Sequence, residues 1–159
     1  MTLIERIRVA KARGDLAGFI GEIPYARFLG ITAAAADGAL TCRVAAKPEN
    51  YGNPVLPAVH GGIVGALMEM TAILQLLWLQ ESVRVPKTIT ITIDYLRSAH
   101  GDRDTFARAE VTKLGARVAN VRALAWQEDP GKPVASANAN FLVVPAERDG
   151  GGDGGAEKT

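Results

Sequence analysis

One long apolar segment limits what this chain can fold into. Residues 60–80 read HGGIVGALMEMTAILQLLWLQ, and Glu69 is the only Asp, Glu, Lys or Arg among them. A segment of this kind can cross a bilayer, lie on a surface as an amphipathic helix, or fill the core of a globular protein. Each alternative requires a different environment for Glu69, so this residue distinguishes them.

The membrane and the solvated surface both suit Glu69 poorly. A carboxylate near the centre of a membrane span costs about 3 kcal/mol on insertion scales. A solvated helix face normally carries several charges. The helical neighbours of Glu69 are small or apolar instead: Gly65, Ala66, Ala72 and Ile73. We therefore expect a core helix in which Glu69 is buried or half-buried, a costly placement unless the carboxylate is paired or used in chemistry.

Several other segments alternate apolar and polar residues, as strands do. Strands are predicted at residues 38–47, 88–96, 104–113, 117–126 and 133–144. In TITITIDYL the alternation places Ile89, Ile91, Ile93 and Tyr95 on one face, and the three later strands carry rows of alanine. Short turns between strands require antiparallel pairing. We predict an α+β fold in which a long central helix is wrapped by a five- to six-stranded antiparallel sheet.

The 159 residues suffice for one domain. We divide the chain into a helical lead-in at residues 1–30, one α+β domain at residues 31–146, and a glycine-rich tail at residues 147–159 that we expect to be disordered. Thr2 and Glu5 have the spacing of a capping box, which indicates that a first helix begins there.

Composition argues against several classes of partner. The formal net charge is +1 and charges of both signs are interspersed, so we expect no nucleic-acid partner. Cys42 is the only cysteine, which excludes an internal disulfide and a metal site built on paired cysteines. We expect no metal, no cofactor and no membrane partner. The first residues lack the apolar run of a signal peptide, so we predict a cytoplasmic protein.

The start of the apolar segment adds a second candidate group. His60, Gly61 and Gly62 lie where the helix begins, and unpaired N–H groups at a helix N-terminus favour developing negative charge. Glycines there let a substrate carbonyl approach the backbone, as in an oxyanion hole for acyl transfer. Desolvation would raise the proton affinity of Glu69 toward the range of a general base.

Gly61 and Glu69 cannot serve one carbonyl within a single chain. They are eight residues apart, which is about 12 Å along a helix, whereas both must lie within about 3 Å of the reacting group. Two antiparallel helices from two copies satisfy this condition. We therefore predict a homodimer with two interfacial sites. Small residues would let the helices approach closely: Gly62, Gly65, Ala66 and Ala72.

Three stretches resemble the hotdog-fold acyl-CoA thioesterases of the phenylacetate-pathway type and their 4-hydroxybenzoyl-CoA thioesterase relatives. They are NP…HGGIVGALMEM, ITIDYLRSAHGD and LGARVANVRALAWQEDPGKPVASANANFLVV, within a resemblance that runs from about Pro24 to Val144. The resemblance implies the hotdog fold, hydrolysis of an acyl-CoA to a free acid and coenzyme A, and a dimer or a dimer of dimers.

The family motif has an amide residue before HGG and an acid nine positions after the histidine. By this resemblance Glu69 is the nucleophile or general base, the Gly61 N–H is the oxyanion donor, and His60 supports the carbonyl site. Asn53 matches the upstream amide, which orients the nucleophile or a water. It lies seven positions before the histidine, where relatives commonly have six. Either a loop bulge restores its position or Asn53 caps a turn.

Three further residues are candidates for substrate binding: Gly62, Arg97 and Arg117. The arginines end strand-like segments and resemble positions where relatives meet coenzyme A phosphates. The sequence has no G-x-S-x-G motif, which excludes the α/β-hydrolase route. Two other functions stay open. One is a non-catalytic acyl-CoA-binding hotdog protein, and the other is a hotdog dehydratase of 3-hydroxyacyl thioesters, which would need a histidine well upstream of Glu69.

Overall fold

The computed structural model describes residues 1–53, 55–81 and 85–143, so the tail predicted at residues 147–159 lies outside the described residues. Three short helices come first: α1 (Leu3–Ala12), α2 (Leu16–Gly21) and α3 (Pro24–Leu29). Thr2 and Glu5 form the predicted capping box at the start of α1. Six strands follow: β1 (Thr32–Ala36), β2 (Ala39–Val44), β3 (Lys87–Tyr95), β4 (Thr105–Leu114), β5 (Val118–Trp126) and β6 (Ala135–Leu142). The turn η1 (Pro48–Asn50) and the long helix α4 (Gly61–Leu79) lie between β2 and β3.

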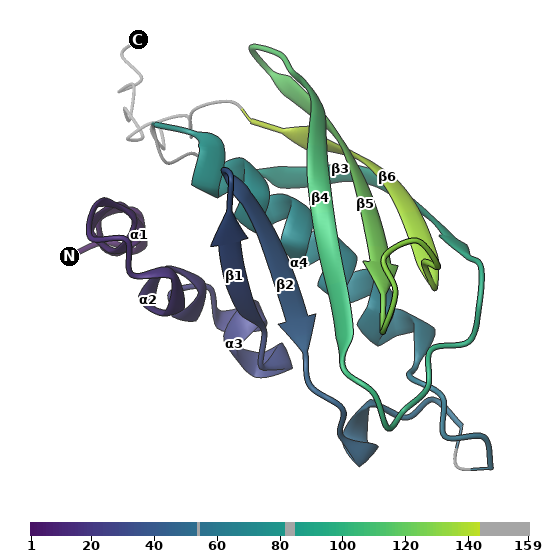
Figure 1. The fold of residues 1–159 in the computed structure, drawn as a ribbon. Coiled ribbons are helices and arrows are strands. Elements are labelled where there is room, and N and C mark those ends of the chain that lie inside the picture. The colour runs from purple at the N-terminus through teal and green to yellow at the C-terminus, as the bar shows by residue number, and fades with distance from the viewer. Residues whose placement is uncertain (54, 82–84, 144–159) are drawn as a thin grey trace, which may run out of the picture.

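The six strands form one sheet that curves around α4 (Figure 1). Its order is β1-β2-β4-β5-β6-β3, and all neighbouring strands are antiparallel. The predicted architecture, a long central helix wrapped by an antiparallel sheet, is confirmed. β1 and β3 are the two edge strands of the sheet. β3, which directly follows α4 in the sequence, therefore lies at an open edge and pairs only with β6 among the described strands.

Rows of alanine on β4, β5 and β6 face α4. Fully buried alanines come from all three strands: Ala107, Ala119, Ala125 and Ala135. The helix supplies large side chains that are also fully buried: Leu67, Met68, Leu74 and Leu77. By length and composition α4 could cross a membrane, but most of it is buried inside the protein, as in a core helix. The small side chains of the sheet therefore accommodate the bulk of the helix, as predicted.

Strand β1 is absent from the strands predicted above. Its residues are Thr-Ala-Ala-Ala-Ala, which lack polar and apolar alternation, and alanine has little intrinsic preference for strands. The strand forms because the chain reverses at Asp37 and Gly38, whose φ angles are 51° and 77°. Positive φ at both central residues is the geometry of a tight hairpin turn, and it pairs Ala36 with Ala39.

The alternation predicted for TITITIDYL is wrong at one position. β3 pairs Thr88 with Phe141 and then Thr90 with Asn140, so an extra residue is accommodated between the two pairs. Because Phe141 faces the core and is fully buried, Thr88 lies on the helix side of the sheet. Ile89 is displaced from the predicted isoleucine face and is 53% exposed.

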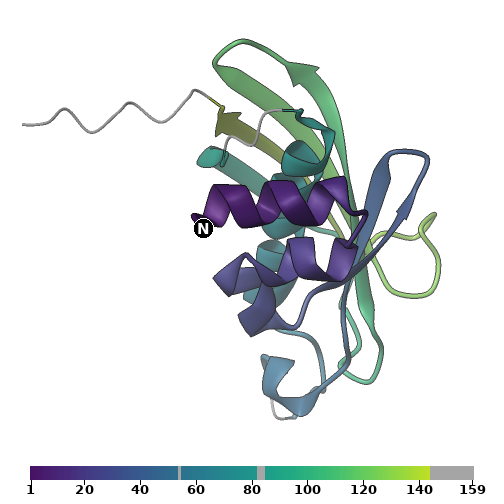
Figure 2. The same cartoon turned by 90° about the vertical axis from the view of Figure 1, so that its left-hand side faces the viewer.

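The N-terminal helices lie against the C-terminal half of α4 (Figure 2). The Lys11 ammonium donates hydrogen bonds to the carbonyls of Leu77 and Gln80, each at 2.5 Å. Phe19 on α2 packs against Trp78 of α4 with ring centroids 5.4 Å apart. Burial lowers the pKa of Lys11. The end of α4 is thus covered and capped by its own chain.

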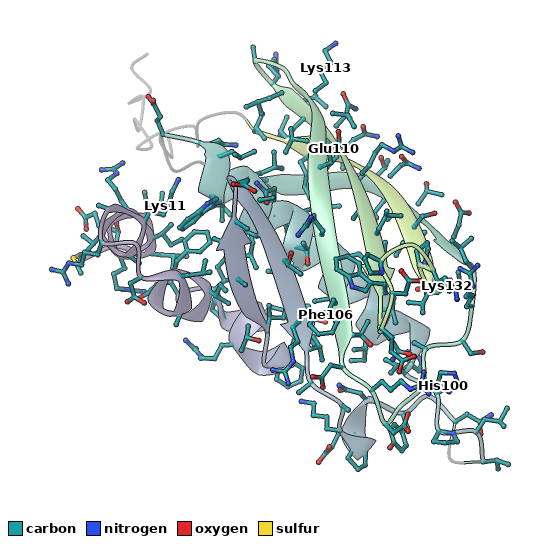
Figure 3. All side chains as sticks on the ribbon, in the orientation of Figure 1. Lys11, His100, Phe106, Glu110, Lys113 and Lys132 are labelled. Atoms are coloured by element: carbon teal, nitrogen blue, oxygen red, sulfur yellow. The ribbon has the colours of Figure 1, made fainter. Side chains whose placement is uncertain are left out.

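The face of the sheet that points away from α4 is more polar (Figure 3). On it, Phe106 of β4 stacks on Trp126 of β5, with ring centroids 6.2 Å apart. Glu110 and Lys113 of the same strand are exposed. The HGG segment and Glu69 belong to the helix and therefore lie on the opposite side of the sheet.

Candidate active site

His60 caps the first turn of α4. Its Nδ1 accepts a hydrogen bond from the Gly62 N–H at 2.8 Å. A ring nitrogen that accepts carries no proton, so the proton of the neutral imidazole is on Nε2. A side chain at Gly62 would place its Cβ 2.9 Å from Nδ1, so this cap requires glycine. The cap leaves the Nε2–H of His60 to donate to another group.

Gly61 is the first residue of α4. Within the described residues its N–H makes no hydrogen bond. The Tyr95 hydroxyl donates to the Gly61 carbonyl at 2.7 Å, and a Cβ on Gly61 would lie 3.2 Å from the tyrosine ring. Tyr95, which the sequence placed on the isoleucine face of a strand, thus holds the first turn of the helix. A fixed, unpaired N–H at a helix N-terminus has the properties that an oxyanion donor needs.

Glu69 lies further along α4 and is half-buried, as predicted. Its Oε1 accepts a hydrogen bond from the Thr88 hydroxyl at 2.6 Å. Thr88 reaches the carboxylate because the extra residue in β3 turns it toward the helix. Strict alternation assigns Thr88 to the other face of the strand, so no local signal in TITIT identifies this contact.

The helix face around Glu69 is apolar and half-exposed. Three residues flank Glu69 at helical spacing and are at least partly exposed: Gly62, Ala66 and Ile73. The prediction that Gly65 and Ala72 extend this open face is wrong. A Cβ on the buried Gly65 would lie 2.9 Å from Cδ1 of Ile93, and Ala72 is 1% exposed. Gly65 lets strand β3 of the same chain approach, rather than a second helix.

Asn53 lies in the loop that precedes α4 and is exposed. Its Oδ1 accepts hydrogen bonds from the N–H groups of Val55 at 2.8 Å and Leu56 at 3.3 Å. The side chain therefore caps a turn, which is the second of the two alternatives stated above. Its amide oxygen is used in that turn, so Nδ2 is the group left for a ligand.

The two candidate arginines lie at opposite ends of α4. Arg97 lines a cavity of about 520 Å3 together with Gly61 and Tyr95, and its guanidinium donates to the Pro133 carbonyl at 2.6 Å. Arg117 precedes β5, beside a cavity at the C-terminal end of α4. The structure thus brings Arg97 close to Gly61 and places Arg117 away from it.

Metal ligands do not gather in the part of the chain that the structure describes. No group of three or more His, Cys, Asp or Glu side chains there could hold an ion. Cys42 on β2 is buried, and burial raises the pKa of its thiol to about 11. The thiol stays protonated at neutral pH and supplies no thiolate nucleophile.

Comparison with known proteins agrees with this architecture. Residues 56–134 match the family model described as Thioesterase superfamily. A protein from Chromobacterium violaceum is 35% identical with a TM-score of 0.70, over 90% of this chain and 99% of that one. A protein from Ralstonia eutropha JMP134, described as a candidate thioesterase and a phenylacetic acid degradation-related protein, is 28% identical with a TM-score of 0.70, over 84% and 98%.

A mutant of the phenylacetic acid degradation protein PaaI from Thermus thermophilus shares the fold. It is 21% identical with a TM-score of 0.64, over 76% of this chain and 98% of that one. No curated protein matches the chain. The family match begins in the loop before α4 and runs to the start of β6, so it includes the HGG segment and Glu69. This chain belongs to the thioesterase superfamily and has the hotdog fold.

Proposed function

We propose that this protein hydrolyses acyl-CoA thioesters to a free acid and coenzyme A. Glu69 of one copy and the Gly61 N–H of a second copy would act on the same thioester carbonyl. The observation that carries the proposal is that one helix presents both a half-buried carboxylate, held by Thr88, and an unpaired N–H at its first residue. Membership of the thioesterase superfamily supports the class of reaction.

Two routes use these groups. As general base, Glu69 takes a proton from water while the water oxygen adds to the thioester carbon. The negative charge on the carbonyl oxygen is stabilised by the Gly61 N–H, the C–S bond breaks, and the thiolate takes the proton from Glu69. As nucleophile, the carboxylate adds to the carbon and expels the thiolate, and water then hydrolyses the resulting anhydride. Thr88 occupies Oε1, so Oε2 is the reacting oxygen.

A single turnover in 18O-labelled water separates the two routes. General-base attack places the label in the released acid. Nucleophilic attack followed by hydrolysis of the anhydride at the Glu69 carbonyl transfers an unlabelled Glu69 oxygen to the acid and leaves the label on the Glu69 side chain, where mass spectrometry of the peptide detects it. Label on the side chain therefore requires the nucleophilic route.

The proposal requires a second copy of the chain. Gly61 and Glu69 are eight residues apart on one helix, so about 12 Å separates them. β3 is an edge strand of nine residues, and an edge of this length pairs readily with another chain. Ile89, Tyr95 and Leu96 are each more than half exposed along or just beyond it. A copy docked along this edge, with its α4 antiparallel, would bring the two groups together.

The direct test is thiol release from a panel of acyl-CoAs by the purified protein. Cys42 is buried, so it adds little to the background of a thiol reagent. We expect Glu69→Gln to lower kcat at least 100-fold while the protein remains a dimer in analytical ultracentrifugation. Binding of acyl-CoA without turnover on any chain would indicate the non-catalytic alternative instead.

Subunit mixing tests where the two groups meet. Gly61→Pro removes the N–H without breaking the helix, because proline is well tolerated at the first position of a helix and His60 already has the extended ψ of 132° that a following proline needs. Gly61→Ala is the matched control, since it keeps the N–H and adds the same contact with Tyr95. We expect Gly61→Ala to retain activity that Gly61→Pro loses.

A mixed dimer of Glu69→Gln and Gly61→Pro subunits contains one site with both defects and one site with neither. The purified mixed dimer should therefore have about half of the wild-type activity, although each parent protein is inactive. No recovery in a verified mixed dimer would show that the two groups do not meet across subunits, and would contradict the proposed site.

A further inference from the structure

Gln127 is a buried polar residue that neither hydrolytic route uses. It directly follows β5 and is 8% exposed. Its Oε1 accepts from the His100 N–H at 2.8 Å, and its Nε2 donates to the His100 carbonyl at 2.8 Å. Nε2 also lies within hydrogen-bond distance of the Arg103 carbonyl (3.3 Å) and the Thr105 hydroxyl (3.4 Å). The side-chain amide thus pairs with both the N–H and the carbonyl of His100, as the backbone of a neighbouring strand would.

On the side away from Gln127, the loop that contains His100 pairs with residues 57–59, which lead into α4. His100 forms an isolated antiparallel bridge with Ala58. The Val59 N–H donates to the Ala99 carbonyl at 2.8 Å, and the Gly101 N–H donates to the carbonyl of residue 57 at 2.6 Å. Residues 99–101 are therefore held between the Gln127 amide and residues 57–59.

Residues 57–59 are paired on their far side as well. Val59 bridges Tyr51, and the Gly52 N–H donates to the Ala58 carbonyl at 2.9 Å. The next residue, His60, donates its N–H to the Asn50 carbonyl at 2.8 Å and then caps the helix. A continuous series of hydrogen bonds thus runs from the end of β5 to the residue before Gly61. Its first link is the Gln127 side chain, and the later links join backbone groups.

We propose that Gln127 is a positioning residue for the oxyanion donor: through residues 99–101 and 57–59 it fixes where the N–H of Gly61 lies. The expected loss of kcat rests on the proposed hydrolysis. The placement of residues 57–60 by Gln127 does not depend on it. The N–H of Gly61 is set by the peptide plane between His60 and Gly61, and the two residues on its N-terminal side, Val59 and His60, are held by this series of hydrogen bonds. A donor displaced by about 1 Å stabilises the transition state much less.

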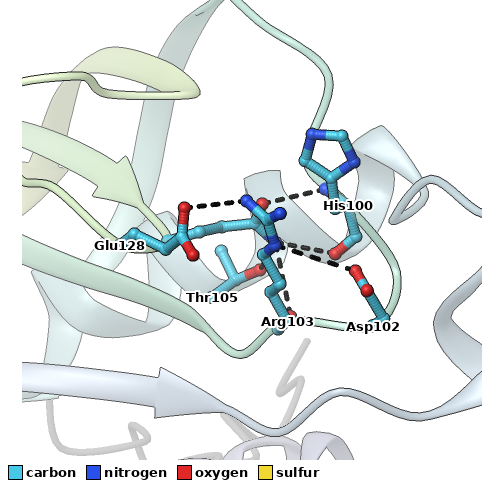
Figure 4. Close-up of polar contacts among 6 residues, drawn as sticks. His100, Asp102, Arg103, Thr105 and Glu128 are labelled. Atoms are coloured by element: carbon cyan, nitrogen blue, oxygen red, sulfur yellow. Dashed lines mark hydrogen bonds and ion pairs between the residues drawn. The ribbon is translucent and has the colours of Figure 1, made fainter.

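The charged contacts of the same loop are poor candidates for this role. Arg103 pairs with Glu128 at 2.8 Å and with Asp102 at 3.9 Å, all three side chains being well exposed (Figure 4). Exposed ion pairs contribute little to rigidity in water. The Gln127 amide is shielded from water, so losing it leaves the His100 N–H without its acceptor and removes one of the two donors to the His100 carbonyl, the other being the Arg103 N–H at 3.3 Å.

The test uses two variants that break the series at different links. Gln127→Met keeps the length and volume of the side chain but removes its hydrogen bonds. Gly101→Ala acts from the other side, since a Cβ there would lie 2.7 Å from the carbonyl of residue 57 and 2.2 Å from the Tyr51 ring. Glu128→Gln is the matched control: it is the adjacent residue, it contacts the same loop, and it removes only the exposed ion pair.

We expect Gln127→Met and Gly101→Ala each to lower kcat about tenfold or more with KM changed less than twofold, because the donor acts in the transition state. Hydrogen exchange should accelerate in the peptides that cover residues 57–62, while Glu128→Gln leaves kcat and exchange unchanged. Unaltered exchange at residues 57–62 in both variants would refute the inference, as would accelerated exchange with unchanged kcat. If the wild-type protein hydrolyses no thioester, the proposed function fails while the exchange experiment still decides whether Gln127 holds this segment.

Discussion

The two ends of helix α4 are built in opposite ways. At the C-terminal end, Lys11 donates to the carbonyls of Leu77 and Gln80, and Phe19 packs on Trp78. At the N-terminal end, the first N–H has no partner among the described residues, and glycines keep the approach open. Helix ends that lack intrahelical partners must be satisfied by side chains, water or a ligand. One end is satisfied by the fold, and the other keeps the N–H that the proposed mechanism uses.

The same contrast separates two of the polar residues of α4, Gln75 and Glu69. Gln75 is 2% exposed; its Oε1 accepts from the Leu40 N–H at 2.7 Å and its Nε2 donates to the Gly38 carbonyl at 3.0 Å. It fastens the β1–β2 turn to the helix. Among the described residues Glu69 has a single donor, the Thr88 hydroxyl, and its side chain is partly exposed. A polar residue with all its partners holds the fold together, whereas one with spare capacity can act on a ligand.

The largest expected effect comes from removing a large side chain from the buried face of α4. Leu74→Ala removes a fully buried side chain, which should lower the free energy of unfolding by about 3 kcal/mol in urea denaturation. The kcat per folded molecule should stay within twofold of wild type, because Leu74 touches no site group. Ile73→Ala, one position away on the half-exposed face, is the control and should cost about 1 kcal/mol. Loss of kcat in folded Leu74→Ala would show that the buried face of α4 also controls the activity that we assign to its half-exposed face.

Releasing the C-terminal end should have the next largest effect. Lys11→Met removes the donor to two carbonyls that are shielded by α1, so we expect a loss of about 2 kcal/mol in unfolding free energy. Hydrogen exchange should accelerate at residues 76–80 and stay unchanged at residues 60–64. Arg8→Met on the same helix is the control, since Arg8 is exposed, and it should change stability by less than about 0.5 kcal/mol. Equal effects of the two substitutions would argue against Lys11 as the cap of α4.

Much of the fold could be predicted because its signals are local. The helical segment and five of the six strands follow from the spacing of apolar residues within each segment. β1 has no such signal, because its alanines form a strand only through the positive φ angles of Asp37 and Gly38 and the pairing with β2. The register shift in β3 is equally invisible, since TITIT alternates regularly whether or not one residue is extra.

The residues of the candidate site likewise fall into those that have a local signal in the sequence and those that have none. Glu69 and the HGG segment are detectable because a lone acid in an apolar helix and glycines at a helix start are unusual in sequence. Thr88 is not, because its contact with Glu69 depends on that register shift. Gln127 is not, because its partners lie more than twenty residues away in the chain. Residues that act directly on a substrate leave a chemical signature, while those that position them depend on the fold.

Thr88→Val sharpens the comparison at Glu69. It keeps the shape of the side chain and removes the hydroxyl that orients Oε1, so kcat should fall about tenfold while KM stays within twofold. Thermal unfolding should change little, because Thr88 is exposed. Thr92→Val is the control, as Thr92 pairs with Asn138 on the outer face of the same strand. An equal loss of kcat in both variants would argue against a specific role for Thr88.

The smallest expected effect concerns Asp104, which follows the loop held by Gln127. The backbone N–H of Ala46 and the Arg43 guanidinium hold the pKa of Asp104 below its ordinary value of 3.8. A carboxyl whose pKa is lower in the folded state stabilises the protein above its unfolded pKa, and this stabilisation is lost as the pH falls through the folded value. Asp104→Asn should therefore be less stable than wild type at pH 7, by less than about 1 kcal/mol because solvent screens the pair.

The difference should shrink below about pH 4 and vanish once Asp104 is protonated in both states, as urea denaturation over a pH series would show. Asp102→Asn is the control: its partner Arg103 is 3.9 Å away and both side chains are exposed, so it should show no such dependence. A constant difference between wild type and Asp104→Asn down to low pH would mean that shape, not charge, matters here. The expected result would show that the end of β2 is tied to the start of β4 partly by exposed charges, whereas the C-terminal end of α4 is held by the part-buried ammonium of Lys11.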